Sequence, residues 1–383
     1  MIATRFFPVV AKQVVRHRTR SLLTVAGVSV AMFLFIAVQS LQQGVRNATE
    51  VTAADQTLVV YRENRFCPAT SRLPEFYGDR IAKIAGVAQV VPMKIVVNNC
   101  AASLDVITFR GVPRDVIGSL ATRWRIIDGS VEDWSKRSDA ALVGENLANR
   151  RGFKIGQSFN SSGVAVTVAG IIRSSEAQDQ NVAYVHLPFL QQSMAKAGVG
   201  IVTQFNVRVN DPAQLDQVAK AIDEAFRSES EPTQTRPEKA FVAQAGSDIV
   251  EIVGFTRYLG WGCLAAVLAL VANAIVLGVQ DRMKEHAVLQ TLGFRGGLIA
   301  RLIVAEGVLV GVIGGALGTL GAFAIVSYGN FSISSEGQSV PVSADVAVIM
   351  TGLAVSAGVG VLAGLVPAWQ AGRREIAQCF RAV

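Results

Sequence analysis

Four long apolar segments, none of which contains a charged residue, constrain this chain more than any other feature. They run from Leu22 to about Leu41, from Tyr258 to Gln280, from Gly307 to about Tyr328, and from Val346 to Trp369. A helix needs about 20 apolar residues to cross a bilayer, and none of the segments alternates like a strand. Four such segments together favour transmembrane α-helices over buried helices of a large soluble protein.

The first segment could also be read as a cleavable signal peptide. About twenty residues precede it, and its apolar core is longer than the roughly 7–15 residues of a signal sequence. No clean small-x-small cleavage site follows, because Gln39, Ser40 and Gln42 occupy that place. We therefore expect an uncleaved anchor.

The positive charge of the chain is concentrated beside these segments. The formal net charge is +7, which could suggest a nucleic-acid partner. Lys and Arg instead gather in the short flanks, and the large region between the first two segments is nearly neutral. The flanking cations are Arg5, Lys12, Arg16, Arg18, Arg20, Arg282, Lys284, Arg295, Arg301, Arg373, Arg374 and Arg381. This distribution is a topology signal rather than a basic patch for nucleic acid.

The same charges predict the orientation in the membrane. Cytoplasmic loops carry an excess of Lys and Arg, and residues 329–345 contain neither. Both termini and the 281–306 loop are therefore expected in the cytoplasm. The resulting division is a cytoplasmic amphipathic segment 1–20, first span 21–42, extracytoplasmic domain 43–240, stalk helix and second span 241–280, cytoplasmic helix 281–301, third span 302–328, short outer loop 329–345, fourth span 346–369 and cytoplasmic tail 370–383.

The extracytoplasmic region has the pattern of a mixed α+β domain. β-branched runs bounded by turn residues predict strands at 57–61, 90–97, 106–110, 141–143, 164–172, 183–187 and 205–209. Helices are predicted at 75–84 and 212–227. The second of these has Asp211 as its N-cap and Pro212 as its first residue. Its apolar residues form one face: Leu215, Val218, Ala219, Ile222 and Phe226.

The end of this region is predicted to lead directly into the second span. Residues 229–237 are polar and contain two prolines, which is typical of a linker. Residues 241–255 have an amphipathic helical pattern that continues into the apolar segment. A helix from 241 to 280 would be about 60 Å long, so its outer part would form a stalk above the membrane.

Two of the four cysteines fall in the outer region. A bridge between Cys67 and Cys100 would close a loop of about 33 residues and stabilise the fold by roughly 3–4 kcal/mol. Two unpaired thiols are the alternative, if the segments that carry them do not meet. Neither cysteine has a His or second Cys at the spacing of a zinc site.

The motifs of several enzyme and carrier classes are missing. The sequence contains no HExxH, no GxxxxGK[ST] phosphate-binding loop and no GxSxG nucleophile elbow. Its histidines are His17, His186 and His286, and a strand position such as that of His186 favours a satisfied core residue. Ion-coupled carriers usually keep an ionisable residue in their spans, and the span centres here have none. We predict no catalytic site, no metal and no directly bound cofactor.

The cytoplasmic stretch from Gln280 to Arg301 contains a short helical pattern. Ala287, Val288, Leu289 and Leu292 are its apolar positions, and Gly293 is placed as a C-cap. Such a helix can dock in a groove on a cytosolic partner, or it can be an interfacial connector between spans. Composition alone leaves both interpretations open.

Glycines at a spacing of three or four residues mark the third and fourth spans. Small residues at this spacing allow helices to approach closely, which favours packing in a bundle or dimer over a glycine-lined conduction path. The candidate packing residues are Gly307, Gly311, Gly314, Gly315, Gly318, Gly360 and Gly364.

The order of one span, a large outer domain and three closing spans resembles the MacB/FtsX-like family of ABC transporter permeases. Four segments carry the resemblance: RHRTRSLLTVAGVSVAMF (16–33), GENLANRRGFKIGQSF (144–159), KEHAVLQTLGF (284–294) and VPAWQAGRREIAQCFR (366–381). Two departures are modest. Arg151–Gly152–Phe153 stands where Leu–Gly is common, and Lys284–Glu285–His286–Ala287 replaces a usual Arg–Glu–Ile–Gly.

The resemblance implies a MacB-like periplasmic core domain and a multi-pass protein of the bacterial inner membrane. It also implies that a cytosolic ABC ATP-binding subunit, which would hold ATP and Mg²⁺, contacts a coupling helix. The coupling residues would be Lys284, Glu285, His286, Val288, Leu289, Leu292 and Gly293. A homo- or heterodimer of permeases, a periplasmic adaptor and membrane lipid are the other implied partners.

Two functions of different class follow from the resemblance. The chain could help to export, extract or release an envelope substrate such as a lipid, lipoprotein, peptide or drug. It could instead relay a signal, as FtsX-type proteins do when they activate a cell-wall hydrolase. The outer region of about 215 residues favours transport, because relays of this family tend to have small outer domains.

Overall fold

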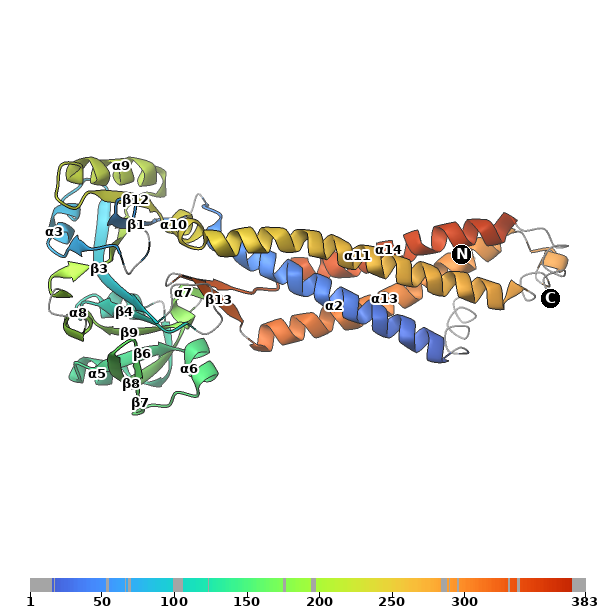
Figure 1. Ribbon diagram of the computed structural model, residues 1–383, viewed down its shortest axis with the longest axis horizontal. Coiled ribbons are helices and arrows are strands. Elements are labelled where there is room, and N and C mark those ends of the chain that lie inside the picture. Colours follow the sequence, from blue (N-terminus) through green and yellow to red (C-terminus); the bar gives the residue numbers. More distant parts are fainter. Residues whose placement is uncertain are drawn as a thin grey trace. The chain divides into compact units, whose positions relative to one another are not determined.

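The computed structural model describes most of the chain (Figure 1). Described are residue 16 and residues 18–52, 55–65, 67, 70–98, 106–122, 124–174, 177–193, 198–283, 288, 290–294, 296–329, 331–335 and 338–373. The chain divides into two compact units. The helical unit comprises residues 1–43, 253–329 and 343–383, and the α/β unit comprises residues 44–252 and 330–342. Each unit is described by itself.

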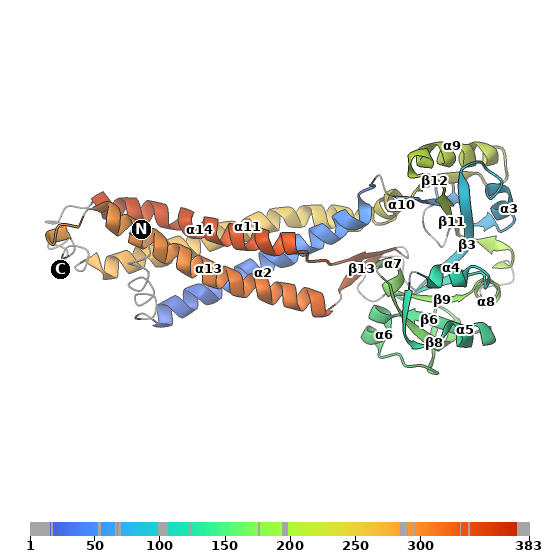
Figure 2. The same ribbon diagram turned by 180° about the vertical axis from the view of Figure 1, so that it is seen from behind.

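Four long helices make up the helical unit, and they are visible from both sides in Figures 1 and 2. They are α2 (Arg18–Thr49), α11 (Ser247–Asp281), α13 (Gly296–Gly329) and α14 (Val346–Arg373). All four are long and apolar enough to cross a membrane, which confirms the predicted spans. Each helix extends beyond its apolar segment at one end or both.

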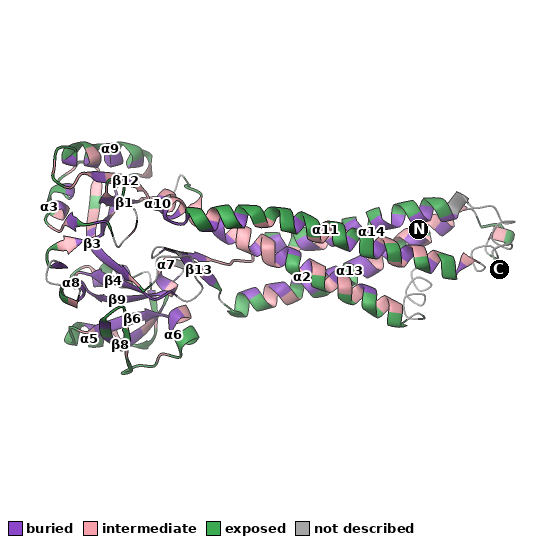
Figure 3. Cartoon of the chain, viewed as in Figure 1, coloured by how far each residue is buried: buried purple, intermediate pink, exposed green. Residues whose placement is uncertain are grey.

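The core of the helical unit is formed by residues spread along all four helices. Met32 and Ile36 of α2, Val271 of α11 and Ile303 of α13 are among its buried members. Other large apolar side chains point outward, and Figure 3 shows these exposed faces along each helix. Helices that are apolar on every side are expected where the surroundings are lipid.

The α/β unit is built on one mixed sheet. In the described residues ten strands belong to it, in the order β12-β1-β11-β3-β4-β9-β6-β8-β5, with β7 paired to β8. Neighbouring strands run antiparallel except in the β4–β9 and β6–β8 pairs. The strands are β1 (Thr57–Arg62), β3 (Val87–Val97), β4 (Thr108–Val112), β5 (Trp124–Gly129), β6 (Ala140–Gly144), β7 (Ser158–Ser161), β8 (Val164–Ser174), β9 (Val182–His186), β11 (Gln204–Val209) and β12 (Thr233–Pro237).

Short helices and one longer helix cover this sheet. They are α3 (Tyr77–Ile81), α4 (Ile117–Ala121), α5 (Val131–Lys136), α6 (Glu145–Arg151), α7 (Ala177–Gln180), α8 (Leu187–Ser193), α9 (Leu215–Phe226) and α10 (Glu238–Ala245). Each of the seven predicted strands overlaps an observed one, and the predicted α+β domain is confirmed. The predicted helix at 75–84 is real but shorter, since α3 ends at Ile81.

Helix α9 shows how local sequence sets this packing. A 3-10 turn (Pro212–Gln214) precedes it, and Asp211 accepts a hydrogen bond from the amide of Ala213 at 2.9 Å, as predicted for the N-cap. The predicted apolar face of α9 is fully buried in one core cluster. Phe226 stacks on Tyr77 of α3 with ring centroids 4.5 Å apart. The helix is therefore held at both ends.

The prediction of a linker at 229–237 is wrong. Residues 233–237 form β12, an edge strand that pairs antiparallel with β1. Asp223 of α9 accepts hydrogen bonds from the Thr235 amide at 3.0 Å and the Thr235 hydroxyl at 2.6 Å. Proline is tolerated at a sheet edge, and threonine here faces a partner on α9. The polar residues of this segment make the contact with Asp223, and they do not indicate a flexible linker.

The prediction of an unbroken helix from 241 to 280 is also wrong. Helix α10 ends at Ala245, Gly246 has φ −98° and ψ 22°, and α11 begins at Ser247. Phe241 packs on Tyr61 of β1 with ring centroids 4.8 Å apart, which fixes α10 on the sheet. The helix is therefore interrupted at Gly246, between α10 and α11. The 35 residues of α11 still span about 50 Å.

The connection between α13 and α14 is more than the predicted loop. It forms a hairpin of β13 (Ser332–Ser335) and β14 (Gln338–Pro341), and it belongs to the α/β unit. The amide of Ser339 donates to Oε1 of Gln178 on α7 at 3.2 Å. A further two-stranded pair joins β2 (Leu73–Pro74) and β10 (Ile201–Val202).

Candidate functional site

The candidate site is the segment that joins α11 to α13, where a docking helix was predicted. Val288 is 50% exposed, Leu292 is 71% exposed and Phe294 is 39% exposed. The remaining predicted docking residues, Lys284, Glu285, His286 and Leu289, lie outside the described residues. Apolar side chains that face solvent in this way mark a surface suited to a partner.

Gly293 ends the short helix in this segment. Its φ is +89°, and its amide donates to the carbonyl of Gln290 at 3.0 Å. The amide of Leu292 donates to the carbonyl of Val288 at 3.1 Å. A left-handed residue after the last helical turn is the geometry of a glycine C-cap, so this part of the prediction is confirmed.

A bidentate ion pair links the first residue of this segment to helix α13. Arg282, directly after α11, donates from Nη1 to Oε2 of Glu306 at 2.8 Å and from Nη2 to Oε1 at 3.1 Å. Arg282 is 6% exposed, and Glu306 lies on α13. Bidentate guanidinium–carboxylate pairs combine two charge-assisted hydrogen bonds with a fixed geometry. The pair therefore holds the end of α11 against α13.

A second ion pair adds α2 to this arrangement. Arg20 Nη1 lies 2.6 Å from Oδ2 of Asp281, the last residue of α11. A Cβ placed at Gly278 would lie 3.0 Å from Nη2 of Arg20, so the guanidinium lies directly over that glycine. Asp281 is exposed, so this pair contributes less free energy than a buried one. Together the two pairs join α2, α11 and α13.

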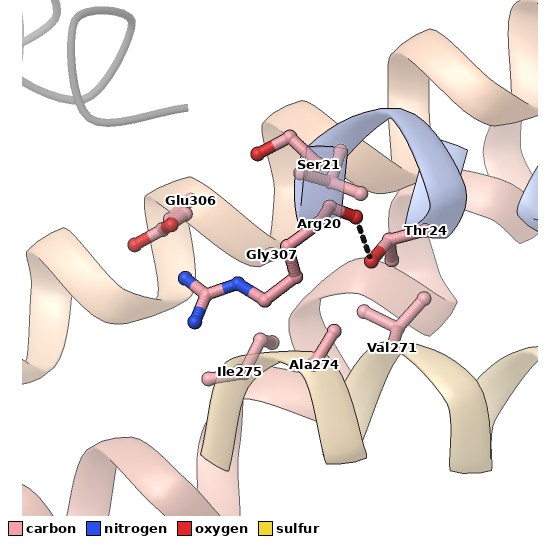
Figure 4. Close-up of a pocket in the computed structure, with 9 residues that line it drawn as sticks. Arg20, Ser21, Thr24, Val271, Ala274, Ile275, Glu306 and Gly307 are labelled. Atoms are coloured by element: carbon pink, nitrogen blue, oxygen red, sulfur yellow. Dashed lines mark hydrogen bonds between the residues drawn. The ribbon is translucent and has the colours of Figure 1, made fainter. Parts of the chain in front are cut away.

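A small pocket, open to solvent, lies beside these ion pairs and is lined by residues of the same three helices (Figure 4). Arg20, Ser21 and Glu306 supply polar groups, and the side chains of α11 facing it are apolar. In Figure 4 the Arg20 side chain extends away from α2, while its backbone carbonyl accepts from the Thr24 hydroxyl at 2.9 Å. The pocket leaves space next to the ion-paired side chains.

Sequence analysis missed this charge cluster. Arg20 and Arg282 are identified from the sequence only as flanking cations, and Asp281 and Glu306 are not singled out. All four lie at the ends of spans predicted to meet on the same side of the membrane. Their shared position and their opposite charges are a sequence signal that could have identified the cluster.

The predicted packing glycines lie at helix crossings within the helical unit. A Cβ at Gly307 of α13 would lie 2.8 Å from the carbonyl oxygen of Gly360 on α14, and one at Gly360 would lie 2.7 Å from that of Gly307. A Cβ at Gly314 would lie 2.7 Å from Cβ of Val28 on α2. The others also face another helix: Gly311 and Gly315 face Ser356, Gly318 faces Ser29, and Gly364 faces Val304.

The predicted Cys67–Cys100 bridge lies partly outside the described residues. Cys67 is half-buried, between β1 and β2 in the chain, and Cys100 belongs to a segment that is not described. The bridge therefore stays a prediction.

A buried polar network lies inside the α/β unit, and the members described here come from four elements, β4, β5, α7 and β9. Arg110 of β4 donates to the Tyr184 hydroxyl at 3.3 Å and to Gln178 Oε1 at 3.0 Å. Tyr184 in turn donates to Asp179 Oδ1 at 2.5 Å, and Trp124 Nε1 donates to Asp179 Oδ2 at 2.8 Å. Burial lowers the pKa of Arg110, but Tyr184 and Asp179 outweigh it and raise that pKa overall. Burial, aided by Asp179, raises the pKa of Tyr184. Asp179 accepts hydrogen bonds at both of its carboxylate oxygens, whereas Nε of the buried Arg110 has no hydrogen-bond partner among the described residues.

His186 is a satisfied core residue, as its strand position predicts. Its Nδ1 accepts from Nε of Arg114 at 3.3 Å, and its Nε2 lies 2.9 Å from the carbonyl oxygen of Trp134. Burial lowers its pKa, and Arg114 adds to that effect. Among the described residues, no group of three His, Cys, Asp or Glu side chains is arranged to hold a metal ion.

Comparison with known proteins places these features in a family. Residues 21–225 match the model of the MacB-like periplasmic core domain, and residues 259–376 match the FtsX-like permease C-terminal model. The first match alone covers more than half of the chain.

Among curated proteins, the chain is similar to macrolide export ATP-binding/permease proteins. The macrolide export ATP-binding/permease protein MacB of Hyphomonas neptunium is 28% identical over 261 residues, covering 64% of this chain and 38% of the relative. The MacB protein of Neisseria meningitidis serogroup A is 22% identical over 399 residues, covering 96% of this chain and 59% of the relative. This chain thus spans about 38–59% of the length of these relatives.

Among solved structures, the periplasmic region of MacB from Actinobacillus actinomycetemcomitans is similar at 10% identity and a TM-score of 0.37, covering 50% of this chain and 92% of that one. Most of the core-domain match, residues 44–225, belongs to the α/β unit, and most of the FtsX-like match, including α13 and α14, belongs to the helical unit. The chain therefore belongs to the MacB/FtsX-like ABC transporter permeases, as a multi-pass membrane protein that carries a MacB-like periplasmic core domain.

Proposed function

We propose that this chain is a membrane-spanning permease subunit that converts ATP hydrolysis by an ATP-binding partner into movement of its α/β unit. The relatives are named ATP-binding/permease proteins, and this chain spans only part of their length. Its sequence has no GxxxxGK[ST] loop. A partner that binds ATP and Mg²⁺ would supply that activity.

The observation that carries this proposal is the exposed apolar surface formed by Val288, Leu292 and Phe294. These residues follow Arg282 in the chain, and Arg282 is ion-paired with Glu306 of α13. A groove on the ATP-binding partner would cover these side chains. Lys284, Glu285, His286 and Leu289 complete the proposed docking segment. Because the segment is tied to α11 and α13 at its base, displacement of the segment would displace both helices.

Helix α11 offers a direct route for this movement. It begins at Ser247 in the α/β unit and ends at Asp281 in the helical unit. A continuous helix transmits displacement along its axis with little loss, since its backbone hydrogen bonds hold it rigid. The α/β unit would then switch between two arrangements that nucleotide binding biases.

The Lys and Arg distribution supports the orientation in this proposal. The docking segment and both termini would be cytoplasmic, and the α/β unit would be periplasmic, in a bacterial inner membrane. Two docking segments would engage two ATP-binding domains, so the permease would act as a homo- or heterodimer. A periplasmic adaptor and membrane lipid are further proposed partners.

The proposed substrate is an envelope molecule such as a lipid, lipoprotein, peptide or drug that is exported, extracted or released. The names of the relatives refer to macrolides, which are large amphipathic drugs, and this supports a substrate with a sizeable apolar surface.

The test is stimulation of an ATP-binding subunit by the chain reconstituted in proteoliposomes. Leu292→Asp should abolish the stimulation while membrane insertion stays intact. Thr291→Asp places the same charge about 100° around the helix and is the matched control that should retain it. Equal stimulation by wild type and Leu292→Asp would contradict the docking surface. Stimulation without any substrate movement, coupled to activation of a cell-wall hydrolase, would favour a signal relay instead.

A further inference from the structure

The small pocket lined by α2, α11 and α13 has a polar end and an apolar end. Arg20, Ser21 and Glu306 supply the polar groups, and Val271 and Ile275 are among the apolar lining residues (Figure 4). All of them belong to the helical unit. A pocket with this division is suited to an amphipathic molecule.

The pocket lies where the three helices change from charged to apolar sequence. Arg20 is two residues before the apolar segment of α2, and Glu306 is directly before that of α13. On α11, Ile275 and Val271 precede Asp281 by about 9 and 15 Å along the axis. The apolar end of the pocket therefore lies at the level of the lipid hydrocarbon. The polar end lies at the level of the headgroups, on the side predicted to be cytoplasmic.

Arg20 keeps hydrogen-bonding capacity at this pocket. A guanidinium carries five N–H donors, and among the described residues only Nη1 of Arg20 has a partner, Oδ2 of Asp281. The Asp281 side chain is 56% exposed, so water can replace this contact at little cost. The planar guanidinium matches the geometry of phosphate oxygens. Arg20 is therefore able to bind a phosphate group that reaches the pocket.

Glu306 determines which charge the bound molecule can carry. Its carboxylate is paired with Arg282, and Arg20 is paired with Asp281, so the four groups together are neutral. A neutral cluster does not attract an anionic molecule by net charge. A headgroup with both signs can instead place its anion on Arg20 and its cation on Glu306. Each carboxylate oxygen has two lone pairs, so Glu306 can accept from an ammonium as well as from Arg282.

We propose that this pocket binds a phosphatidylethanolamine molecule, with its phosphate on Arg20, its ammonium on Glu306 and its apolar part against Val271 and Ile275. Phosphoethanolamine has one anionic group and one cationic group that donates hydrogen bonds. Phosphocholine has the same charges but no N–H donor, and phosphoglycerol has no cation. The proposal rests on the membrane-spanning chain of the proposed function, and it names the class and the location of its lipid partner.

Native mass spectrometry of the full chain tests this assignment. The chain is held in detergent micelles with equal amounts of phosphatidylethanolamine, phosphatidylcholine and phosphatidylglycerol that carry the same acyl chains. Wild type should retain phosphatidylethanolamine in preference, and Arg20→Gln should retain about 10-fold less of it, because charge-assisted hydrogen bonds are lost.

Arg18→Gln is the matched control for Arg20→Gln. It removes the same charge at nearly the same depth, about 160° around α2, from a residue that does not line the pocket. It should retain the lipid as wild type does. Equal loss in the two variants, or equal retention of the three lipids by wild type, would overturn the proposal.

Two further variants address the two ends of the pocket. Asp281→Asn weakens the group that competes for Arg20, so it should retain about 2- to 5-fold more phosphatidylethanolamine. Ala274→Leu enlarges a lining side chain and should retain less. Ala269→Leu makes the same change at an exposed position of α11 outside the pocket and should have no effect. Lower retention in Asp281→Asn than in wild type would contradict phosphate binding by Arg20.

A competition experiment separates a membrane lipid from a soluble phosphate ester. Glycerophosphoethanolamine carries the same headgroup without acyl chains, and an excess of it should leave the bound lipid in place. Displacement of the lipid by this compound would refute a membrane lipid as the ligand.

This proposal and the proposed function fail separately. If the chain stimulates an ATP-binding subunit but retains the three lipids equally, only the lipid site is refuted. If it retains phosphatidylethanolamine through Arg20 but stimulates no ATP-binding subunit, the lipid site stands and the proposed function fails.

Discussion

Arg282 and Glu306 form a bidentate ion pair, with donor–acceptor distances of 2.8 and 3.1 Å, between the end of α11 and the early turns of α13. Glu306→Ala would leave the buried guanidinium of Arg282 without its counter-charge. We expect this variant to lose about 3 kcal/mol of stability, at the low end for breaking a buried pair because Glu306 keeps some exposure. Unfolding in mixed micelles would measure the loss.

The charge reversal Arg282→Glu with Glu306→Arg should recover much of this stability, whereas each single reversal should not. Asp281→Ala is the comparison at the exposed pair with Arg20 and should cost less than about 1 kcal/mol. A Glu306→Ala variant no less stable than Asp281→Ala would show that the first pair does not hold the two helices together.

The crossing of α13 and α14 at Gly307 and Gly360 predicts a second effect. Gly307→Ala places a methyl group 2.8 Å from a backbone oxygen that cannot rotate away, so the helices must separate. Overpacking of this kind costs about 1–3 kcal/mol. Gly321→Ala in the same helix is the control, because its Cβ would meet Phe33 at an ordinary 4.0 Å. Thermal unfolding that affects both variants equally would contradict close packing at Gly307.

How well the sequence predicts each part of the fold depends on how far apart in the chain the interacting residues lie. The four spans and helix α9 depend on local apolar patterns, and the sequence predicts each of them, although the span helices extend beyond their apolar segments. The apolar face of α9, from Leu215 to Phe226, is an example. Glycine spacing likewise identified positions that turn out to lie at helix crossings.

What sequence did not predict depends on distant partners. Thr233 and Thr235 are polar, and only the contact with Asp223 on α9 makes them part of an edge strand. Arg282 and Glu306 are separated by 24 residues, so neither reveals the other. The break at Gly246 follows from the packing of Phe241 on β1, and no local pattern records that contact.

A disulfide between Cys67 and Cys100 remains a testable expectation. If it forms, reduction should destabilise the α/β unit by roughly 3–4 kcal/mol, because the cross-link restricts the unfolded chain. Cys67→Ser should have the same effect as reduction, and Cys263→Ser, in α11, is the control that should have none. Mass spectrometry of the non-reduced protein would identify the linked peptides. Ready alkylation of both thiols without reductant would show that the bridge does not form.

His186 predicts a pH dependence near neutrality. Burial lowers its pKa in the folded state from the ordinary value of 6.5, and Arg114 occupies the nitrogen that would take the second proton. Above pH 6.5 the ring is neutral in both states and its contribution is complete. As pH falls below 6.5 the unfolded chain binds the proton first, so the stability of the α/β unit falls until the folded pKa is reached.

Hydrogen exchange in β9, measured between pH 7.5 and 5.5, would detect this loss of stability. His186→Gln should remove the slope of stability against pH. The described carboxylates with lowered pKa are Glu145 beside Arg173, Asp139 beside Arg137 and Asp133, which is hydrogen-bonded to Ser130. Their contribution is lost only below their ordinary values of 4.5 and 3.8, so it does not overlap this range. An unchanged slope in His186→Gln would assign the effect to another group.

The buried network around Asp179 predicts graded losses of stability in the α/β unit. Tyr184→Phe removes one hydroxyl that donates to Asp179 and accepts from Arg110, so it should cost about 1–3 kcal/mol. Asp179→Ala leaves the Arg110 guanidinium buried without a counter-charge and should cost more, about 3–5 kcal/mol. Because Gln178 accepts from both Arg110 and the Ser339 amide, Asp179→Ala should also speed hydrogen exchange in β14. Faster exchange in β13 and β14 without any change in β4 would mean that the hairpin is held independently of this network.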